Sequence, residues 1–87
     1  VTVFGAAPTR LLRRGARVGD ALWVSGALGG PGVALDAWQR GAVPPTAARA
    51  RFARPEARLA LGTLLAEYGA TAAIDVSDGL VADASHI

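Results

Sequence analysis

The sequence predicts an α+β chain in which α/β layers form from short strands and amphipathic helices. Two observations support this prediction. Short β-branched and aromatic runs alternate with longer segments whose apolar residues recur at helical spacing, and Gly-containing turns separate the two kinds of segment. That alternation is typical of layered folds with helices packed on a sheet. The length of 87 residues corresponds to roughly one small domain.

Three short runs are expected to be strands. Residues 1–4 are β-branched and aromatic and end at a Gly-Ala-Ala-Pro turn. Residues 21–24 follow the turn signal Gly19-Asp20 and are apolar enough for a buried strand. Residues 72–76 form a third apolar run, which leads into a polar turn.

Four segments are expected to be helical, and residues 9–18 are expected to be a connector. The clearest helix has Pro55 at its first position, Glu56 in its first turn and Gly69 just past its end. A polar turn opens the last helix. The expected helices are residues 33–40, a short one at 46–51, 55–68, and a segment from Leu80 onward.

The composition excludes several classes of protein. The absence of Cys excludes a disulfide scaffold, a zinc ribbon and thiol catalysis, and it is compatible with a cytoplasmic protein. No apolar run reaches the roughly 18 residues of a membrane span, and no signal peptide is recognisable. Because there is no Met, and because the chain opens in a strand-like run and stops in a helical pattern, we interpret it as a piece of a longer protein.

Charge is divided unevenly along the chain. All nine cations are Arg; residues 1–60 have a net charge of +6 and residues 61–87 a net charge of −4. A small basic nucleic-acid-binding module is therefore one hypothesis. It is weakened because Phe4 is the one aromatic residue near the first Arg run that is suited to base stacking, and because the acidic last third would repel a phosphate backbone.

The strongest local indication of chemistry is the segment 75–80, where a predicted strand meets a helix start. Asp75 and Asp78 offer hard oxygen ligands for Mg²⁺, while the hydroxyl of Ser77 and the amides of the helix start can bind nucleotide phosphates. The alternative is structural: Ser77 caps the helix, Asp78 interacts with the helix dipole, and Asp75 lies in a surface turn. Both interpretations remain open from the spacing alone.

Two further features have weaker functional interpretations. The Gly-rich segment 25–32 can surround a phosphate with amides, but it matches neither a Walker loop nor a dinucleotide fingerprint, and such a segment is more often a flexible connection. The connector carries an Arg run, and Arg makes forked bonds to phosphate. At least two of these four side chains are expected to be ordinary surface Arg; the run comprises Arg10, Arg13, Arg14 and Arg17.

Three blocks of the chain together resemble one enzyme family. They are residues 13–26, residues 51–59, and residues 73–80 followed by Asp83 and His86. In this order they resemble the central part of thiamine-monophosphate kinase, in the superfamily of aminoimidazole ribonucleotide synthetase. The form Ser-Asp-Gly-Leu at 77–80 is similar to the thiamine-phosphate branch rather than to the other branches.

The resemblance implies a fragment of a PurM-like two-domain fold, mostly the first part of the C-terminal domain. Residues 1–15 would be the tail of the N-terminal domain and the connector, and residues 16–87 the incomplete C-terminal domain. The implied activity is ATP-dependent phosphorylation of thiamine monophosphate to thiamine diphosphate, in a cytoplasmic homodimer that binds neither nucleic acid nor membrane. Another ATP-dependent small-molecule enzyme of the superfamily is the alternative, and the isolated piece is expected to be inactive.

The resemblance also implies site residues. Asp75 and Asp78 look like Mg²⁺ ligands, Ser77 like an ATP contact, and Arg13 like the Arg that binds ATP from the connector. The connector is one residue shorter than is usual in the family, so Arg14 is the nearest rival to Arg13. Residues 30–32 depart from the family pattern, which puts a phosphate role for that turn in doubt.

Overall fold

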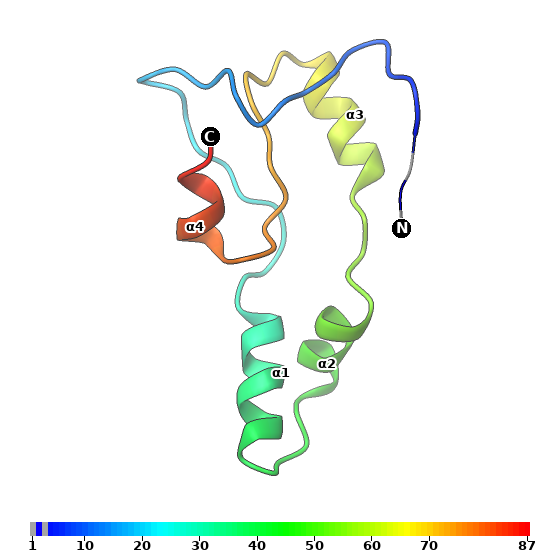
Figure 1. The fold of residues 1–87 in the computed structure, drawn as a ribbon, viewed down its shortest axis with the longest axis vertical. Coiled ribbons are helices and arrows are strands. Elements are labelled where there is room, and N and C mark those ends of the chain that lie inside the picture. The colour runs from blue at the N-terminus through cyan, green and yellow to red at the C-terminus, as the bar shows by residue number, and fades with distance from the viewer. Residues whose placement is uncertain (1, 3) are drawn as a thin grey trace. The chain divides into compact units, whose positions relative to one another are not determined.

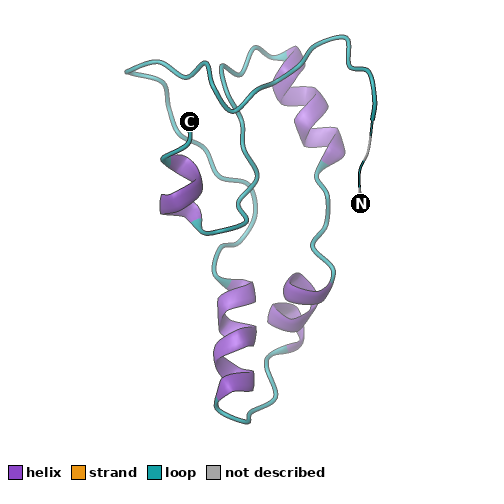
Figure 2. Ribbon diagram, viewed as in Figure 1, coloured by secondary structure: helices purple, strands orange, loops and turns teal. Residues whose placement is uncertain are grey.

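The computed structural model describes residues 2 and 4–87, and the regular structure in these residues is helical (Figures 1 and 2). The chain divides into two compact units. Residues 22–57 form one unit, here called the hairpin unit, and residues 1–21 with 58–87 form the other, here called the connector unit. The helices are α1 (Gly30–Gln39), α2 (Thr46–Ala53), α3 (Leu59–Glu67) and α4 (Leu80–Ala84).

In the hairpin unit, α1 and α2 pack against each other (Figure 1). Ala34 of α1 is fully buried and Ala48 of α2 is 8% exposed, so small side chains allow the two helices to approach closely. At the edge of this contact the rings of Trp38 and Phe52 meet edge to face, with their centroids 5.0 Å apart and their planes at 80°. Both expected helices of this unit are confirmed, although the first begins three residues earlier, at Gly30.

In the connector unit, α3 is shorter than the sequence predicts. The helix begins at Leu59, so the prediction that it begins at Pro55 is wrong. The backbone at Arg58 (φ −89°, ψ 58°) is not helical, and α2 has already ended at Ala53, so residues 54–58 link the two helices. The last helix begins at Leu80, as predicted, and ends at Ala84.

The predicted strands do not form in the described residues. Segments 21–24 and 72–76 have no regular structure there, and Val1 and Val3 of the predicted strand at residues 1–4 lie outside the described residues. A strand needs a ladder of hydrogen bonds to a neighbour. Segment 72–76 has one long-range backbone bond, from Ala73 N to Leu12 O at 2.9 Å, and one bond is not a ladder. The α+β fold class and the domain boundary between residues 15 and 16 stay predictions.

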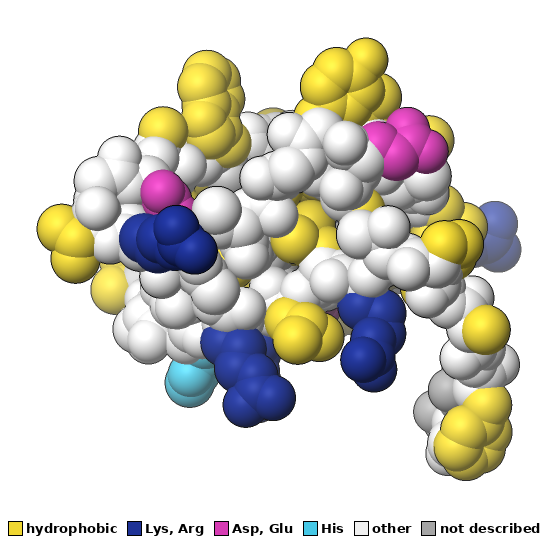
Figure 3. Space-filling model, turned by 90° about the horizontal axis from the view of Figure 1, so that it is seen from above, with side chains coloured by type: hydrophobic (Ala, Val, Ile, Leu, Met, Phe, Trp, Pro, Cys, Tyr) yellow, Lys and Arg dark blue, Asp and Glu magenta, His cyan; other side chains and the backbone are white. Residues whose placement is uncertain are grey.

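Many bulky apolar side chains are exposed. Figure 3 shows large hydrophobic side chains, in yellow, standing out from the surface. Trp23 of the hairpin unit is 87% exposed and Tyr68 of the connector unit is 83% exposed. None of the described helices has the length and apolar run that a bilayer crossing needs.

Candidate functional site

The turn at residues 77–79 is held by one carboxylate. Oδ2 of Asp83 accepts hydrogen bonds from three consecutive backbone N–H groups, those of Ser77 at 2.8 Å, Asp78 at 3.0 Å and Gly79 at 3.1 Å. In return, the N–H of Asp83 donates to the carbonyl oxygen of Gly79 at 2.9 Å. Gly79 has φ 124°, a backbone conformation that only glycine adopts readily. These bonds fix the turn that precedes α4.

Asp83 is a buried charge that is compensated. Its exposed fraction is 4%. Burial raises the pKa of Asp83, but the three amide bonds and the nearby His86 outweigh burial, so the pKa lies below its ordinary value. The carboxyl group is therefore ionised at neutral pH, and the amides of the turn stabilise its charge.

The predicted site residues of this turn are accessible. Asp75, Ser77 and Asp78 are all exposed, and within residues 2 and 4–87 none of their side chains is hydrogen-bonded or paired. No cluster of three or more His, Cys, Asp or Glu suited to a metal occurs in the described chain. Two carboxylates nevertheless fit Mg²⁺, which is commonly held by one or two carboxylates together with substrate phosphates and water.

The amides just before this helix start are taken by Asp83, and the expectation that amides of the helix start itself bind phosphate stays a prediction. The N–H groups of residues 77–79 already donate to Asp83, so they are not free for a second anion. Because the carboxylate is intramolecular and buried, it competes strongly with any phosphate for these donors. Contacts to a nucleotide at this turn are thus left to the side chains.

The connector runs beside the segment that leads to the turn (Figure 1). Besides the bond between Ala73 and Leu12, Oγ1 of Thr71 donates to Oδ2 of Asp20 at 2.7 Å. Gly15 has φ 137°, and a Cβ at this position would lie 2.5 Å from the carbonyl oxygen of Thr71, so only glycine allows this approach. The contacts bring the predicted ATP-binding connector and the predicted metal-binding segment together in one unit.

Arg13 and its rival Arg14 both line an open depression of about 340 Å³ in the connector unit. Leu12 and His86 complete its lining. His86 follows the end of α4, whereas the acidic turn precedes the start of that helix. Because α4 has five residues, its two ends are about 7.5 Å apart, and a nucleoside triphosphate is long enough to span that distance. The depression does not distinguish Arg13 from Arg14.

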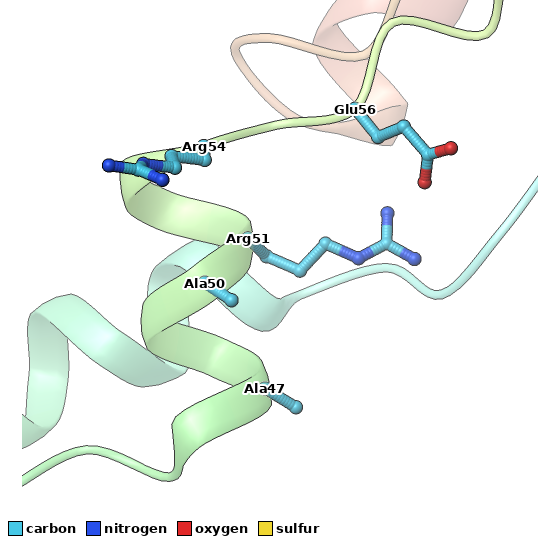
Figure 4. A pocket seen from close by; sticks show the side chains of 5 residues that line it. All are labelled: Ala47, Ala50, Arg51, Arg54 and Glu56. Atoms are coloured by element: carbon cyan, nitrogen blue, oxygen red, sulfur yellow. The ribbon is translucent and has the colours of Figure 1, made fainter.

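A second depression, of about 300 Å³, lies on α2 and the residues after it in the hairpin unit. Figure 4 shows Arg51 and Glu56 extending toward each other and Arg54 pointing away. Among residues 2 and 4–87 the one ion pair within 4 Å is instead Arg40 with Asp36. The Gly-rich turn of this unit begins α1, with Gly29 at φ 82°, and its phosphate role stays a prediction.

Sequence reasoning missed two polar residues that organise the connector unit. Asp83 was part of the family pattern but had no assigned role, and Asp20 was interpreted only as a turn residue. A signal for Asp83 existed, because an acid in the first turns of a helix often reaches back to amides before it. Asp20 is different: its partner Thr71 lies 51 residues away, and no local pattern indicates that pairing.

Most of the chain is similar in sequence to enzymes that carry one name. No family model and no solved structure matches this chain. The chain is 44% identical over 88% of its length to thiamine-monophosphate kinase of Methanopyrus kandleri, and 44% identical over 99% of its length to that of Caulobacter vibrioides. It is 41% identical over 95% of its length to that of Mycobacterium tuberculosis.

The resemblance to thiamine-monophosphate kinases is confirmed. The matches cover most of this chain but only 24–25% of these three relatives, so the chain spans about a quarter of their length. The segment from the connector to the end of α4 is thus similar to about a quarter of the length of each of these enzymes.

Proposed function

We propose that this chain is a central part of an ATP-dependent kinase that phosphorylates thiamine monophosphate to thiamine diphosphate. The observation that carries the proposal is the similarity of 41–44% to three thiamine-monophosphate kinases over nearly the whole chain. The geometry supports it, because Asp75, Ser77 and Asp78 are exposed on a turn that Asp83 holds in place.

In this proposal Asp75 and Asp78 hold Mg²⁺ at the turn. A bound Mg²⁺ supplies positive charge that neutralises phosphate oxygens as the phosphoryl group moves. The hydroxyl of Ser77 donates to a phosphate oxygen, which is the role left to it because its own amide is bonded to Asp83.

Arg13 is proposed to bind the nucleotide from the connector. Its guanidinium can make two parallel bonds to phosphate. Phosphoryl transfer depends mainly on positioning and charge stabilisation, so the proposal requires no protein base in this chain. Arg14 lines the same depression and is the alternative donor.

The decisive experiment is an assay of the full-length protein that carries this sequence, with ATP, Mg²⁺ and thiamine monophosphate. We expect thiamine diphosphate and ADP in equal amounts, and no turnover when EDTA removes the metal. ADP formed without thiamine diphosphate, with a different small-molecule acceptor, would support the alternative enzyme of the superfamily. A cytoplasmic homodimer is part of the proposal, and light scattering of the full-length protein tests the dimer.

A further inference from the structure

The environment of Asp83 is unusual within the described chain. It is the buried charged residue there, and one of its oxygens accepts bonds from three successive amides. A carboxylate taken out of water is unfavourable unless such bonds compensate it. The sequence spacing achieves this, because Asp83 lies on the first turns of α4 and the chain before the helix folds back over it.

The three bonded amides show what Asp83 constrains. They belong to residues 77, 78 and 79, which all precede α4, rather than to the free amides of its first turn. An N-cap side chain bonds to the amides of that first turn, and an acid inside a helix can bond back to the N-cap amide, which here is that of Gly79. The bonds to the amides of residues 77 and 78 reach beyond such a cap. Moreover, α4 has only five residues, so there is little helix to stabilise. The bonds instead fix the backbone that carries two of the proposed site residues.

We infer that Asp83 is a positioning residue that locks the turn at 77–79, so that Ser77 and Asp78 present their side chains together with Asp75 toward Mg²⁺ and the nucleotide. This inference rests on the proposed function. Asp83 does not touch the substrate; it acts by holding two neighbouring backbone units. It also occupies the amides of the turn, so the nucleotide is bound there through side chains and metal.

The test compares Asp83→Asn and Asp83→Ala in the full-length protein with Glu67→Gln as a matched control. Glu67 is an exposed acid at the end of α3, in the same unit, so its variant also removes one negative charge. Mn²⁺ is used in place of Mg²⁺, and its affinity is measured by electron paramagnetic resonance with ATP present. Hydrogen exchange of the peptide that covers residues 77–79 is measured in parallel.

For Asp83→Ala we expect the Mn²⁺ dissociation constant to rise about 10- to 100-fold, as for other residues that orient metal ligands. Asp83→Asn keeps an acceptor oxygen and should show a smaller rise. Amides 77–79 should exchange faster in both variants, while exchange elsewhere and the Glu67→Gln control stay unchanged. Raised Mg²⁺ should restore turnover, which a merely structural defect would not allow. If Asp83→Ala does not fold, the Mn²⁺ affinity and the amide exchange of Asp83→Asn test the inference instead.

The variants Asp75→Asn and Asp78→Asn distinguish a failure of this inference from a failure of the proposed function. If these variants lose Mn²⁺ affinity while Asp83→Asn and Asp83→Ala retain it, Asp83 is not a positioning residue, and the proposed function stands. If all four variants retain wild-type Mn²⁺ affinity, the metal assignment in the proposed function is itself wrong.

Discussion

Different kinds of contact stabilise the interior of each of the two units. The hairpin unit relies on apolar packing, with Ala34 and Ala48 between its helices and an aromatic pair at their edge. The connector unit relies on polar bonds: Asp83 binds three amides, and Asp20 binds Thr71 across 51 residues of sequence. This difference indicates that the functional residues are to be expected in the connector unit. Polar bonds are directional, so they fix side chains at defined positions, whereas packing of small residues mainly fixes how closely two helices approach.

The largest effect on activity should come from removing the carboxylate of Asp78 in the connector unit. The matched control removes the carboxylate of Asp36 in the hairpin unit. Under the proposed function we expect Asp78→Asn to lower kcat/KM of the full-length protein more than about 100-fold, because a direct metal ligand should matter more than the residues around it. Asp36→Asn removes an exposed acid of α1 that pairs with Arg40. It should leave kcat/KM within about twofold of wild type, since exposed pairs contribute little. Equal losses in both variants would contradict the division between the units.

Gly15→Ala should disturb the connector unit next most strongly. Its Cβ would lie 2.5 Å from the carbonyl oxygen of Thr71 at φ 137°, so the connector must move away from the segment that leads to Asp75. We expect a loss of about 1–3 kcal/mol in the free energy of unfolding, from backbone strain and the clash, together with a higher KM for ATP. Denaturant titration and initial-rate kinetics measure the two effects.

Gly19→Ala is the matched control for that variant. Gly19 also has a positive φ, 102°, but no atom lies within 4 Å of its Cβ position. The control therefore carries backbone strain without the clash, and it should leave the KM for ATP unchanged. A raised KM for ATP in Gly19→Ala would show that backbone strain elsewhere in the connector unit is enough to weaken ATP binding, without a clash with Thr71.

The sequence predicted what depends on neighbouring residues and failed where distant partners decide. Four helices were predicted, because apolar spacing and glycine signals are local. The start at Pro55 was wrong: proline permits a first helical turn but does not require one, and the backbone at Arg58 interrupts it. The strands at 21–24 and 72–76 were predicted from apolar runs, yet a strand exists only with a bonded partner, which the described residues do not supply.

The same distinction applies to the candidate site. Asp75, Ser77 and Asp78 could be selected because they are adjacent in sequence and their residue types suit a metal and a phosphate. The structure leaves their side chains exposed, and their roles stay predictions. Asp83 was not given a role, because its function depends on the chain folding back over it, which the residue types alone do not reveal.

In the hairpin unit, the aromatic pair provides the next prediction. Phe52→Ala should lower the free energy of unfolding by about 1–2 kcal/mol, because Phe52 is half-buried against the ring of Trp38. Val43→Ala is the control; its side chain is 87% exposed, and we expect a change within about 0.5 kcal/mol. Denaturant titration measures both variants. Mn²⁺ affinity should be unchanged in each, and a loss in Phe52→Ala would show that the hairpin unit also positions the metal ligands.

The smallest expected effect is the pH dependence of Asp20 in the connector unit. The hydrogen bond from Thr71, then the N–H of Arg17 and its charge, outweigh burial and hold the pKa of Asp20 below its ordinary value of 3.8. A lowered pKa in the folded state means that the carboxylate stabilises the fold above about pH 4, and that this stabilisation is lost as pH falls through the folded pKa. Asp20→Asn should therefore have a lower Tm than wild type at pH 7, and the difference should shrink below pH 4. Glu67→Gln, which removes an exposed acid without such bonds, should show no comparable trend. A difference for Asp20→Asn that stays constant from pH 7 to pH 2 would mean that the charge of this carboxylate does not hold the connector beside Thr71.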